Sequence, residues 1–98
     1  MKIIWTYTAK GTFAQILEYL LENWTTKEVD KFTEEVRNII SQIEGNPYMF
    51  EASSKNKSVR KGFVNSLVSL FYRVQPQKKE IELLLFWNNR QNPKKRKY

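Results

Sequence analysis

The side chains best suited to chemistry in this 98-residue chain are basic and lie in its second half. Residues 51–98 carry twelve Lys and Arg against three Glu, a net charge of +9, whereas residues 1–50 carry a net charge of −2. Such an asymmetry indicates a surface for a phosphate-rich or acidic partner. The alternative is a basic surface that only keeps the protein soluble.

The composition excludes several other kinds of chemistry. The chain has no Cys and no His, so thiolate catalysis, a His general base and any Cys- or His-ligated metal are ruled out. Its three Gly are isolated and form no phosphate-binding loop, and its Glu residues are scattered. We therefore expect no cofactor and no metal site. Any catalysis would rest on Lys, Arg, Tyr, Asp or Glu.

Hydropathy predicts a cytoplasmic protein that does not enter a membrane. No apolar run approaches the ~20 residues that cross a bilayer. The opening segment, Met-Lys-Ile-Ile-Trp-Thr-Tyr, lacks the long apolar stretch of a signal peptide.

The N-terminal segment predicts a strand followed by a helix. Residues 2–7 are rich in β-branched and aromatic side chains, which is typical of a strand. Apolar side chains then recur at helical spacing over residues 13–24, so we expect a helix over residues 9–24. Thr8 is in position to cap it.

A second apolar stripe predicts a helix over residues 26–44. Thr25 and Glu28 have the spacing of a capping box at its start. Gly45 is placed to end it in a left-handed conformation. Because only one or two residues separate the two helices, we expect them to form an antiparallel hairpin.

The second half of the chain predicts strands. A polar loop over residues 45–57 precedes three β-rich segments at residues 57–64, 67–74 and 80–87. The last two are almost continuously apolar, which suits central strands. Residues 88–98 are polar and basic, and we expect a tail without structure of its own.

These elements predict an α+β domain with the order β-α-α-β-β-β. Its antiparallel sheet is covered on one face by the N-terminal helical hairpin. The domain spans residues 1–87, and residues 88–98 form a basic C-terminal tail.

The strand register decides which side chains share a face. A two-residue turn at Asn65 and Ser66 would place Arg60 opposite Phe71. One face then carries Val59, Phe63, Val68, Leu70, Tyr72 and Val74, and the other carries Arg60, Gly62, Ser69, Phe71 and Arg73. The first set suits contact with the helices, although Lys61 falls on the same face in this register. The second could hold a phosphate backbone or the acidic side chains of a partner protein.

Six short segments, taken together, resemble toxins of the RelE/ParE superfamily from type II toxin–antitoxin modules. They are Thr8-Ala9, Tyr19-Leu20 with Trp24, Ile43 with Asn46-Pro47, Val59-Arg60-Lys61, Ser69 to Val74, and Phe86-Trp87 with Arg90-Gln91 and Pro93. The resemblance implies a growth-inhibiting toxin that a cognate antitoxin neutralises. An antitoxin segment with an apolar helix and acidic residues would complement the outer side of the first helix at Tyr19 and the cationic sheet face.

Two activities occur in this superfamily. The RelE-like branch cleaves mRNA in the ribosome, with basic residues on the sheet face and a Tyr or His near the C-terminus. The ParE-like branch poisons DNA gyrase by binding. Carried over by position, Arg60 and Arg90 match the nuclease pattern and Tyr98 is the only tail tyrosine, but Gly62 and Ser69 stand where basic residues are expected. Arg73 is offset from an expected place.

The incomplete nuclease set favours the ParE-like branch, which needs only a binding surface. Its expected partners are the cognate antitoxin and DNA gyrase, and the expected target-binding residues are Arg60, Phe71, Arg73, Arg90, Lys94, Lys95, Arg96 and Lys97. The alternative is a RelE-like endonuclease acting on the ribosome and mRNA through Arg60, Arg73, Arg90 and Tyr98. A third possibility is a decayed toxin that only pairs with its antitoxin.

Overall fold

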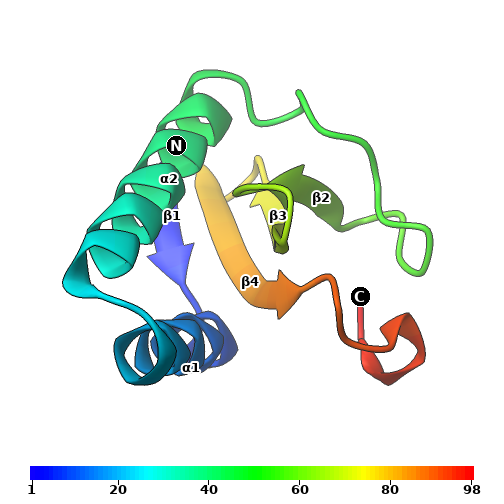
Figure 1. Cartoon of the computed structure of the whole chain (residues 1–98). Helices are drawn as coiled ribbons and strands as arrows, with labels where there is room; N and C mark the ends of the chain where they lie inside the picture. The colour runs from blue at the N-terminus through cyan, green and yellow to red at the C-terminus, as the bar shows by residue number, and fades with distance from the viewer.

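The computed structural model describes residues 1–98 and contains two helices packed beside a four-stranded sheet (Figure 1). This arrangement confirms the predicted α+β class and the order of the elements. In chain order they are β1 (Lys2–Trp5), α1 (Tyr7–Asn23), α2 (Thr26–Gly45), β2 (Arg60–Phe63), β3 (Val68–Gln75), β4 (Glu80–Asn88) and the short 3-10 helix η1 (Pro93–Lys95). No helix combines the length and the apolar character that a membrane crossing requires.

The strands lie in the order β1-β4-β3-β2. The apolar strands β3 and β4 occupy the centre, as their composition predicts. β2, β3 and β4 pair antiparallel, but β1 pairs parallel with β4, so the sheet is mixed rather than wholly antiparallel. Most of the chain separates β1 from β4, and no tight turn forces these two strands to run in opposite directions.

Both helices cover one face of the sheet, and the main core lies between them and the strands (Figure 1). The aromatic rings of Trp5, Phe13 and Phe86 join the layers. The ring centroids of Trp5 and Phe13 lie 5.4 Å apart, and each lies 5.5 Å from the centroid of Phe86. The Thr12 hydroxyl accepts a hydrogen bond from the Phe86 amide at 3.0 Å. These contacts fix α1 against β4.

Both helices begin or end slightly differently from the prediction. α1 starts at Tyr7 because Thr6, not Thr8, is its N-cap: the Thr6 hydroxyl accepts from the Ala9 amide and donates to the Leu83 carbonyl on β4. Thr25 precedes α2 as expected, but its side chain makes no capping bond. Gly45 is the last helical residue, and no glycine has a positive φ.

The turn between β2 and β3 is longer than predicted, and it shifts the register by one residue. The Val64 amide bonds the Val68 carbonyl at 2.9 Å. The Asn65 side-chain oxygen accepts from the amides of Leu67 and Val68 at 2.8 and 2.9 Å. Consequently Arg60 pairs with Tyr72 rather than with Phe71.

The shift reverses the predicted faces of β2, because strand side chains alternate between faces. Gly62 lies against Ile39 and Phe50 on the helix side, and Arg60 shares that side. Val59 belongs instead to a second cluster on the opposite face, with Phe71, Leu84 and Leu85. We call this side of the sheet, away from the helices, the open face. A register irregularity beside Leu84 brings both Leu84 and Leu85 to it.

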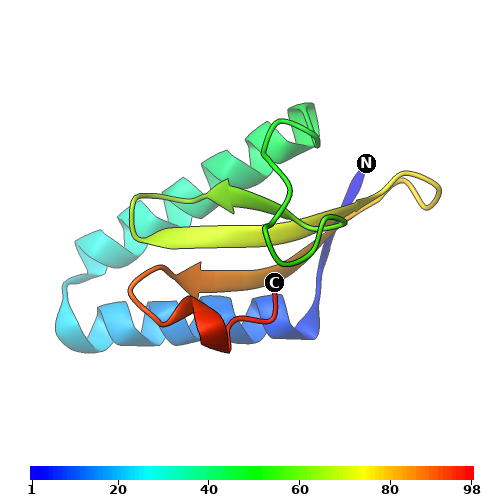
Figure 2. The same ribbon diagram turned by 90° about the vertical axis from the view of Figure 1, so that its right-hand side faces the viewer.

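The loop over residues 46–59 and the C-terminal tail meet on the open face (Figure 2). The loop leaves α2, packs Phe50 on the helix side, and then passes the edge of β2, where the amide of Lys61 donates to the carbonyl of Glu51 at 3.0 Å. Ser53, further along, bonds the last residue of the tail. Loop and tail therefore cover the sheet surface that the helices leave free.

Candidate functional site

The open face is built around the ring of Phe71, which is fully buried. The ring of Tyr98 stacks on it with the centroids 6.5 Å apart. The Arg96 guanidinium lies 4.8 Å from the same centroid, and the Lys61 ammonium lies 5.9 Å from it. Two cations from distant parts of the chain thus share one aromatic ring, an arrangement favoured by the negative potential above it.

Hydrogen bonds fasten the tail to the loop. The Lys55 ammonium donates to the carbonyl of Pro93, the first residue of η1, and to that of Arg96, its C-cap, the latter at 2.7 Å. The Ser53 hydroxyl donates to the main-chain oxygen of Tyr98 at 2.8 Å. The expectation of an unstructured tail is therefore wrong. The tail is ordered because it covers an apolar cluster and because Lys55 and Ser53 donate hydrogen bonds to its main-chain oxygens.

Arg60, the first predicted site residue, points away from the open face. Its guanidinium donates to the carbonyl of Phe50 at 2.6 Å and of Tyr48 at 3.4 Å, and it lies 4.9 Å from the Tyr48 ring centroid. These contacts hold the loop after α2 against β2. The prediction that Arg60 shares a face with Phe71 and Arg73 is corrected by the one-residue shift in register.

Arg73 lies on β3 opposite Glu82 of β4. Its guanidinium is 3.8 Å from the Glu82 carboxylate, and the two side chains are 31% and 25% exposed. Glu82 also accepts a hydrogen bond from Gln75. Arg73 is thus partly neutralised, although its charge still reaches solvent.

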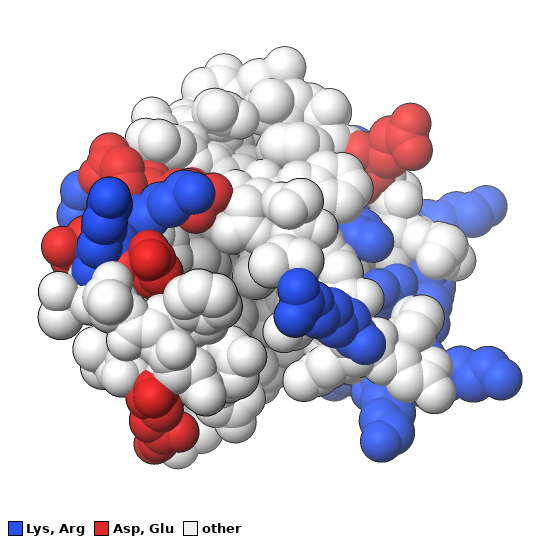
Figure 3. Space-filling model, in the orientation of Figure 1, with Lys and Arg blue, Asp and Glu red and all other residues white.

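The remaining predicted cations are exposed. Lys94, Lys95 and Lys97 project from η1 and the residue pair after it. Arg90 follows β4 and lines a groove on the helix side of the molecule rather than the open face. Figure 3 shows that Lys and Arg gather at the right of the view, where loop and tail lie, whereas the helix side carries both signs.

The four residues of the endonuclease alternative are not assembled into one constellation. No hydrogen bond or ion pair joins any two of Arg60, Arg73, Arg90 and Tyr98. Phosphodiester cleavage by a 2′-hydroxyl needs a base, an acid and charge stabilisation within reach of one phosphate. Arg60 and Arg90 in particular lie outside the open face.

Lys61 is a cation of the open face that sequence reasoning placed among the core residues. Its ammonium lies between the rings of Phe63 and Phe71, at 5.5 and 5.9 Å from their centroids. Burial lowers the pKa of Lys61 from its usual 10.5, and the charge of Arg96 lowers it further. The sequence did contain a signal for this position. The predicted register placed a lysine on the core face, and such a placement argues for a longer turn and the opposite register.

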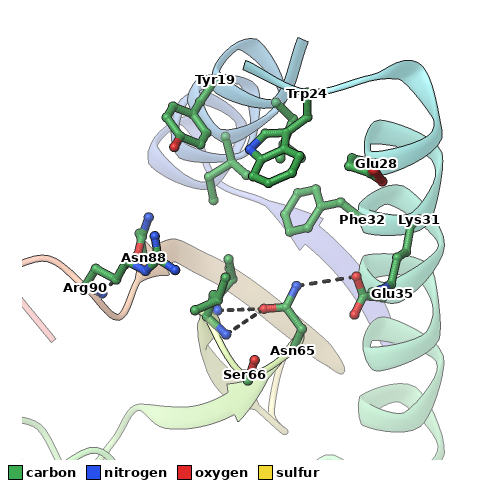
Figure 4. Close-up of a pocket in the computed structure, with 14 residues that line it drawn as sticks. Tyr19, Trp24, Glu28, Lys31, Phe32, Glu35, Asn65, Ser66, Asn88 and Arg90 are labelled. Atoms are coloured by element: carbon green, nitrogen blue, oxygen red, sulfur yellow. Dashed lines mark hydrogen bonds between the residues drawn. The ribbon is translucent and has the colours of Figure 1, made fainter. Parts of the chain in front are cut away.

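A groove of about 560 Å³ opens between the helical hairpin and the β2–β3 turn (Figure 4). Tyr19 and Leu20 of α1 form one wall together with Trp24, the residue that follows this helix, and Asn65 to Val68 form the other. Tyr19, Trp24 and Leu67 are 53%, 59% and 44% exposed. Its rim is charged, with Glu28, Lys31 and Glu35 on α2 and Arg90 after β4. Such an apolar channel suits an amphipathic helix.

No family model matches this chain, and no curated protein sequence does. Eight chains from solved structures do, among them the following two. The "YoeB/ParE toxin from Agrobacterium tumefaciens" matches with a TM-score of 0.66 and 13% identity, over 91% of this chain and 99% of that one. A chain of the "Chromosomal ParDE TA system from P. aeruginosa" matches with a TM-score of 0.65 and 19% identity, over 90% and 95%.

These structures match about nine-tenths of this chain, so the likeness extends over most of the fold. At such low identity it establishes architecture and leaves activity to the site itself. The fold expected from the resemblance of the sequence is confirmed: this chain has the fold of the RelE/ParE toxins.

Proposed function

We propose that the protein is the toxin of a type II toxin–antitoxin module, and that it acts by binding DNA gyrase rather than by cutting RNA. The preference for binding over RNA cleavage rests on one observation: the residues expected to form the nuclease site do not lie together. Arg60 is bonded to the carbonyls of Phe50 and Tyr48, and Arg90 lines the groove. A toxin that works by binding needs no proton-transfer set, only an exposed surface with a complementary partner.

The decisive experiment adds the purified protein to DNA gyrase in a supercoiling assay. We expect inhibition at a toxin concentration close to that of gyrase. A triple variant, Lys94→Gln, Lys95→Gln and Lys97→Gln, should inhibit less, because it lacks the exposed tail cations. The matched control, Lys10→Gln, Lys27→Gln and Lys31→Gln, removes the same charge from the helices. Undisturbed supercoiling at excess toxin would refute gyrase as the target.

One observation favours the endonuclease alternative. Arg73 and Tyr98 do share the open face, together with Lys61 and Arg96. If this set cleaved mRNA, primer extension on a translated message would show cuts in codon register. Those cuts would disappear in Tyr98→Phe, which keeps the stacked ring and removes only the hydroxyl.

We further propose that the antitoxin places an amphipathic helix in the groove beside Trp24 and Tyr19. The groove is lined in part by apolar side chains, and the aromatic rings of Tyr19 and Trp24 are exposed in it. An exposed apolar patch of this kind typically marks an interaction site. Trp24→Ala should weaken antitoxin binding by about 2 kcal/mol or more, as is typical of a central aromatic anchor. Tyr7→Ala is the control, because Tyr7 is 93% exposed on α1 and lies outside the groove. Equal affinity of both variants would place the antitoxin elsewhere.

Growth tests distinguish an active toxin from a decayed toxin that only binds its antitoxin. Expression without antitoxin should arrest growth, and co-expression of a cognate antitoxin should restore it. A chain that binds its antitoxin but never arrests growth would be a decayed toxin.

A further inference from the structure

β1 is an open edge of the sheet. It pairs only with β4, and the main-chain amides of Lys2 and Thr6 donate to carbonyls at and just before β4, at 2.8 and 3.2 Å. Consecutive residues of a strand direct their main-chain groups to opposite sides. The amide and carbonyl groups of Ile3 and Trp5 therefore point away from β4, where no other strand lies.

The opposite edge of the sheet is partly covered by the chain itself. There the amide of Ser53 donates to the carbonyl of Val59 at 2.7 Å, and the amide of Lys61 donates to the carbonyl of Glu51 at 3.0 Å. Free main-chain groups on an edge strand are a template for a further strand, and proteins usually protect them with Pro or with charged side chains. Residues 3–5 of β1 carry neither, so this edge is available for pairing.

Apolar side chains accompany the open edge. On the helix side of β1, a cavity of about 320 Å³ lies beside Trp5, and Phe13 of α1 and Val36 of α2 help to line it. A strand added along β1 would direct every second side chain toward this side of the sheet. Met1 and Tyr7, just before and just after this segment, are 47% and 93% exposed. The edge thus offers both main-chain hydrogen bonds and an apolar place for a side chain, as strand addition requires.

The strand β1 of a second copy fits this edge. In an antiparallel pair centred on Ile4, Ile3 of one copy lies opposite Trp5 of the other, and the two residues exchange both main-chain hydrogen bonds. Directly opposed residues share a face of the sheet, so Ile3 of the second copy would lie next to the cavity beside Trp5. The same register brings Met1 of one copy close to Tyr7 of the other.

Charge favours this antiparallel pair over a parallel one. Lys2 is the only charged residue of β1. A parallel pair would set the two Lys2 ammonium groups side by side, whereas the antiparallel pair places them at opposite ends of the contact. The centre of the contact is then apolar, with Ile4 of one copy facing Ile4 of the other.

We propose that two copies of this chain associate by antiparallel pairing of their β1 strands about a two-fold axis at Ile4, which joins their sheets into one. The pairing adds about four main-chain hydrogen bonds and few side-chain contacts, so the interface is small and the dimer is weak. β1 lies on the far side of the molecule from the loop and the tail (Figure 1), so the open face stays free in the dimer. The dimer needs neither gyrase nor an antitoxin and stands apart from the proposed function.

The test is sedimentation velocity of the protein alone at concentrations from about 1 μM to about 1 mM, the range in which weak complexes form. We expect a monomer at the low end and a dimer at the high end. Hydrogen exchange measured by NMR should slow at the amides of Ile3 and Trp5 as the concentration rises, and the amide of Phe63 on the opposite edge should not change. A sedimentation coefficient that is independent of concentration would overturn the proposal. So would a dimer in which the amides of Ile3 and Trp5 exchange as fast as in the monomer.

Three variants complete the design. Ile4→Lys should raise the dissociation constant of the dimer by about tenfold or more, because it sets two ammonium groups face to face across the axis. Ile4→Val keeps the apolar contact and should keep the dimer. The matched control is Phe63→Lys, which adds the same charge to β2 at a side chain that is 56% exposed and should leave the dimer intact. A dimer equally strong in Ile4→Lys and in this control would overturn the pairing through β1.

Discussion

Gly62 has the least room of the three glycines. A Cβ added there would lie 3.0 Å from the Ile39 side chain and 3.2 Å from the Phe50 ring, where neighbours must move. Gly62→Ala should therefore lower the free energy of unfolding by about 1–3 kcal/mol, measured by denaturant titration. Gly11→Ala, with nothing within 4 Å in α1, should instead raise it by about 0.5–1 kcal/mol. Equal effects of both changes would contradict the packing around Gly62.

The same contact explains why a basic residue at this position would not complete a nuclease. Position 62 is where the family pattern calls for a second cation, but here its side chain would enter the packing of Ile39 and Phe50. The observed register turns position 62 toward the helices, and the glycine that departs from the family pattern is the residue that fits there.

Tyr72 gives stability a dependence on alkaline pH. The ring is buried, and its hydroxyl donates to the Pro47 carbonyl at 2.8 Å. Burial raises the pKa of Tyr72 above its usual 10.0, although the charge of Arg60 opposes this. The folded protein therefore keeps a proton that the unfolded chain loses. This contribution is complete below pH 10 and is lost as the pH rises through the folded pKa.

We expect the free energy of unfolding of the wild type to fall, relative to Tyr72→Phe, as the pH rises above 10. At neutral pH the variant should be less stable by about 1 kcal/mol, because it loses one hydrogen bond. Lys61 has the opposite sign, since its lowered pKa makes an unfavourable contribution that fades as the pH approaches 10.5. Lys61 is present in both proteins and so cancels in the difference. A difference that stays constant with pH would show that Tyr72 titrates normally.

At the scale of elements, the β2–β3 turn decides what the open face carries. The Asn65 side-chain oxygen accepts two backbone hydrogen bonds, and its amide donates to Glu35 at 3.4 Å. Asn65→Ala should cost about 1–2 kcal/mol of stability in thermal or denaturant unfolding. Asn65→Asp in a Glu35→Gln background keeps the accepting oxygen without placing two carboxylates side by side, so it should retain most of the stability. If Asp were as damaging as Ala, the turn would not depend on that oxygen.

The turn also shows where prediction from sequence succeeded and where it stopped. Helical stripes and β-rich segments located α1, α2, β3 and β4 well, because burial imposes a period on each. The face of β2 depended on one extra residue in a turn, and in a four-residue strand only Lys61, a lysine on the predicted core face, argued against the predicted register. The order of the tail came from contacts distant in sequence, such as Lys55 with η1, which no local pattern records.

At the scale of the whole molecule, charge is separated from the apolar groove. The cations of loop and tail gather on one side, whereas the groove lies between the hairpin and the turn, with both signs on its rim (Figures 3 and 4). The two surfaces should therefore act at different stages of association. Long-range charge raises the rate of encounter, and the desolvated apolar contacts slow dissociation.

The proposed antitoxin should reveal this division kinetically. If its docking segment is acidic, as the basic surface requires, the association rate constant should fall steeply as salt is raised, because a Debye length of about 10 Å at 0.1 M shortens to about 3 Å at 1 M. The tail variant lacking Lys94, Lys95 and Lys97 charges should associate more slowly with a flatter salt dependence. Trp24→Ala should keep the association rate and dissociate faster, because Trp24 lines the groove and carries no charge. Surface plasmon resonance across a salt series measures both rate constants. An association rate that is insensitive to salt in the wild type would mean that the basic side of the molecule faces a different partner.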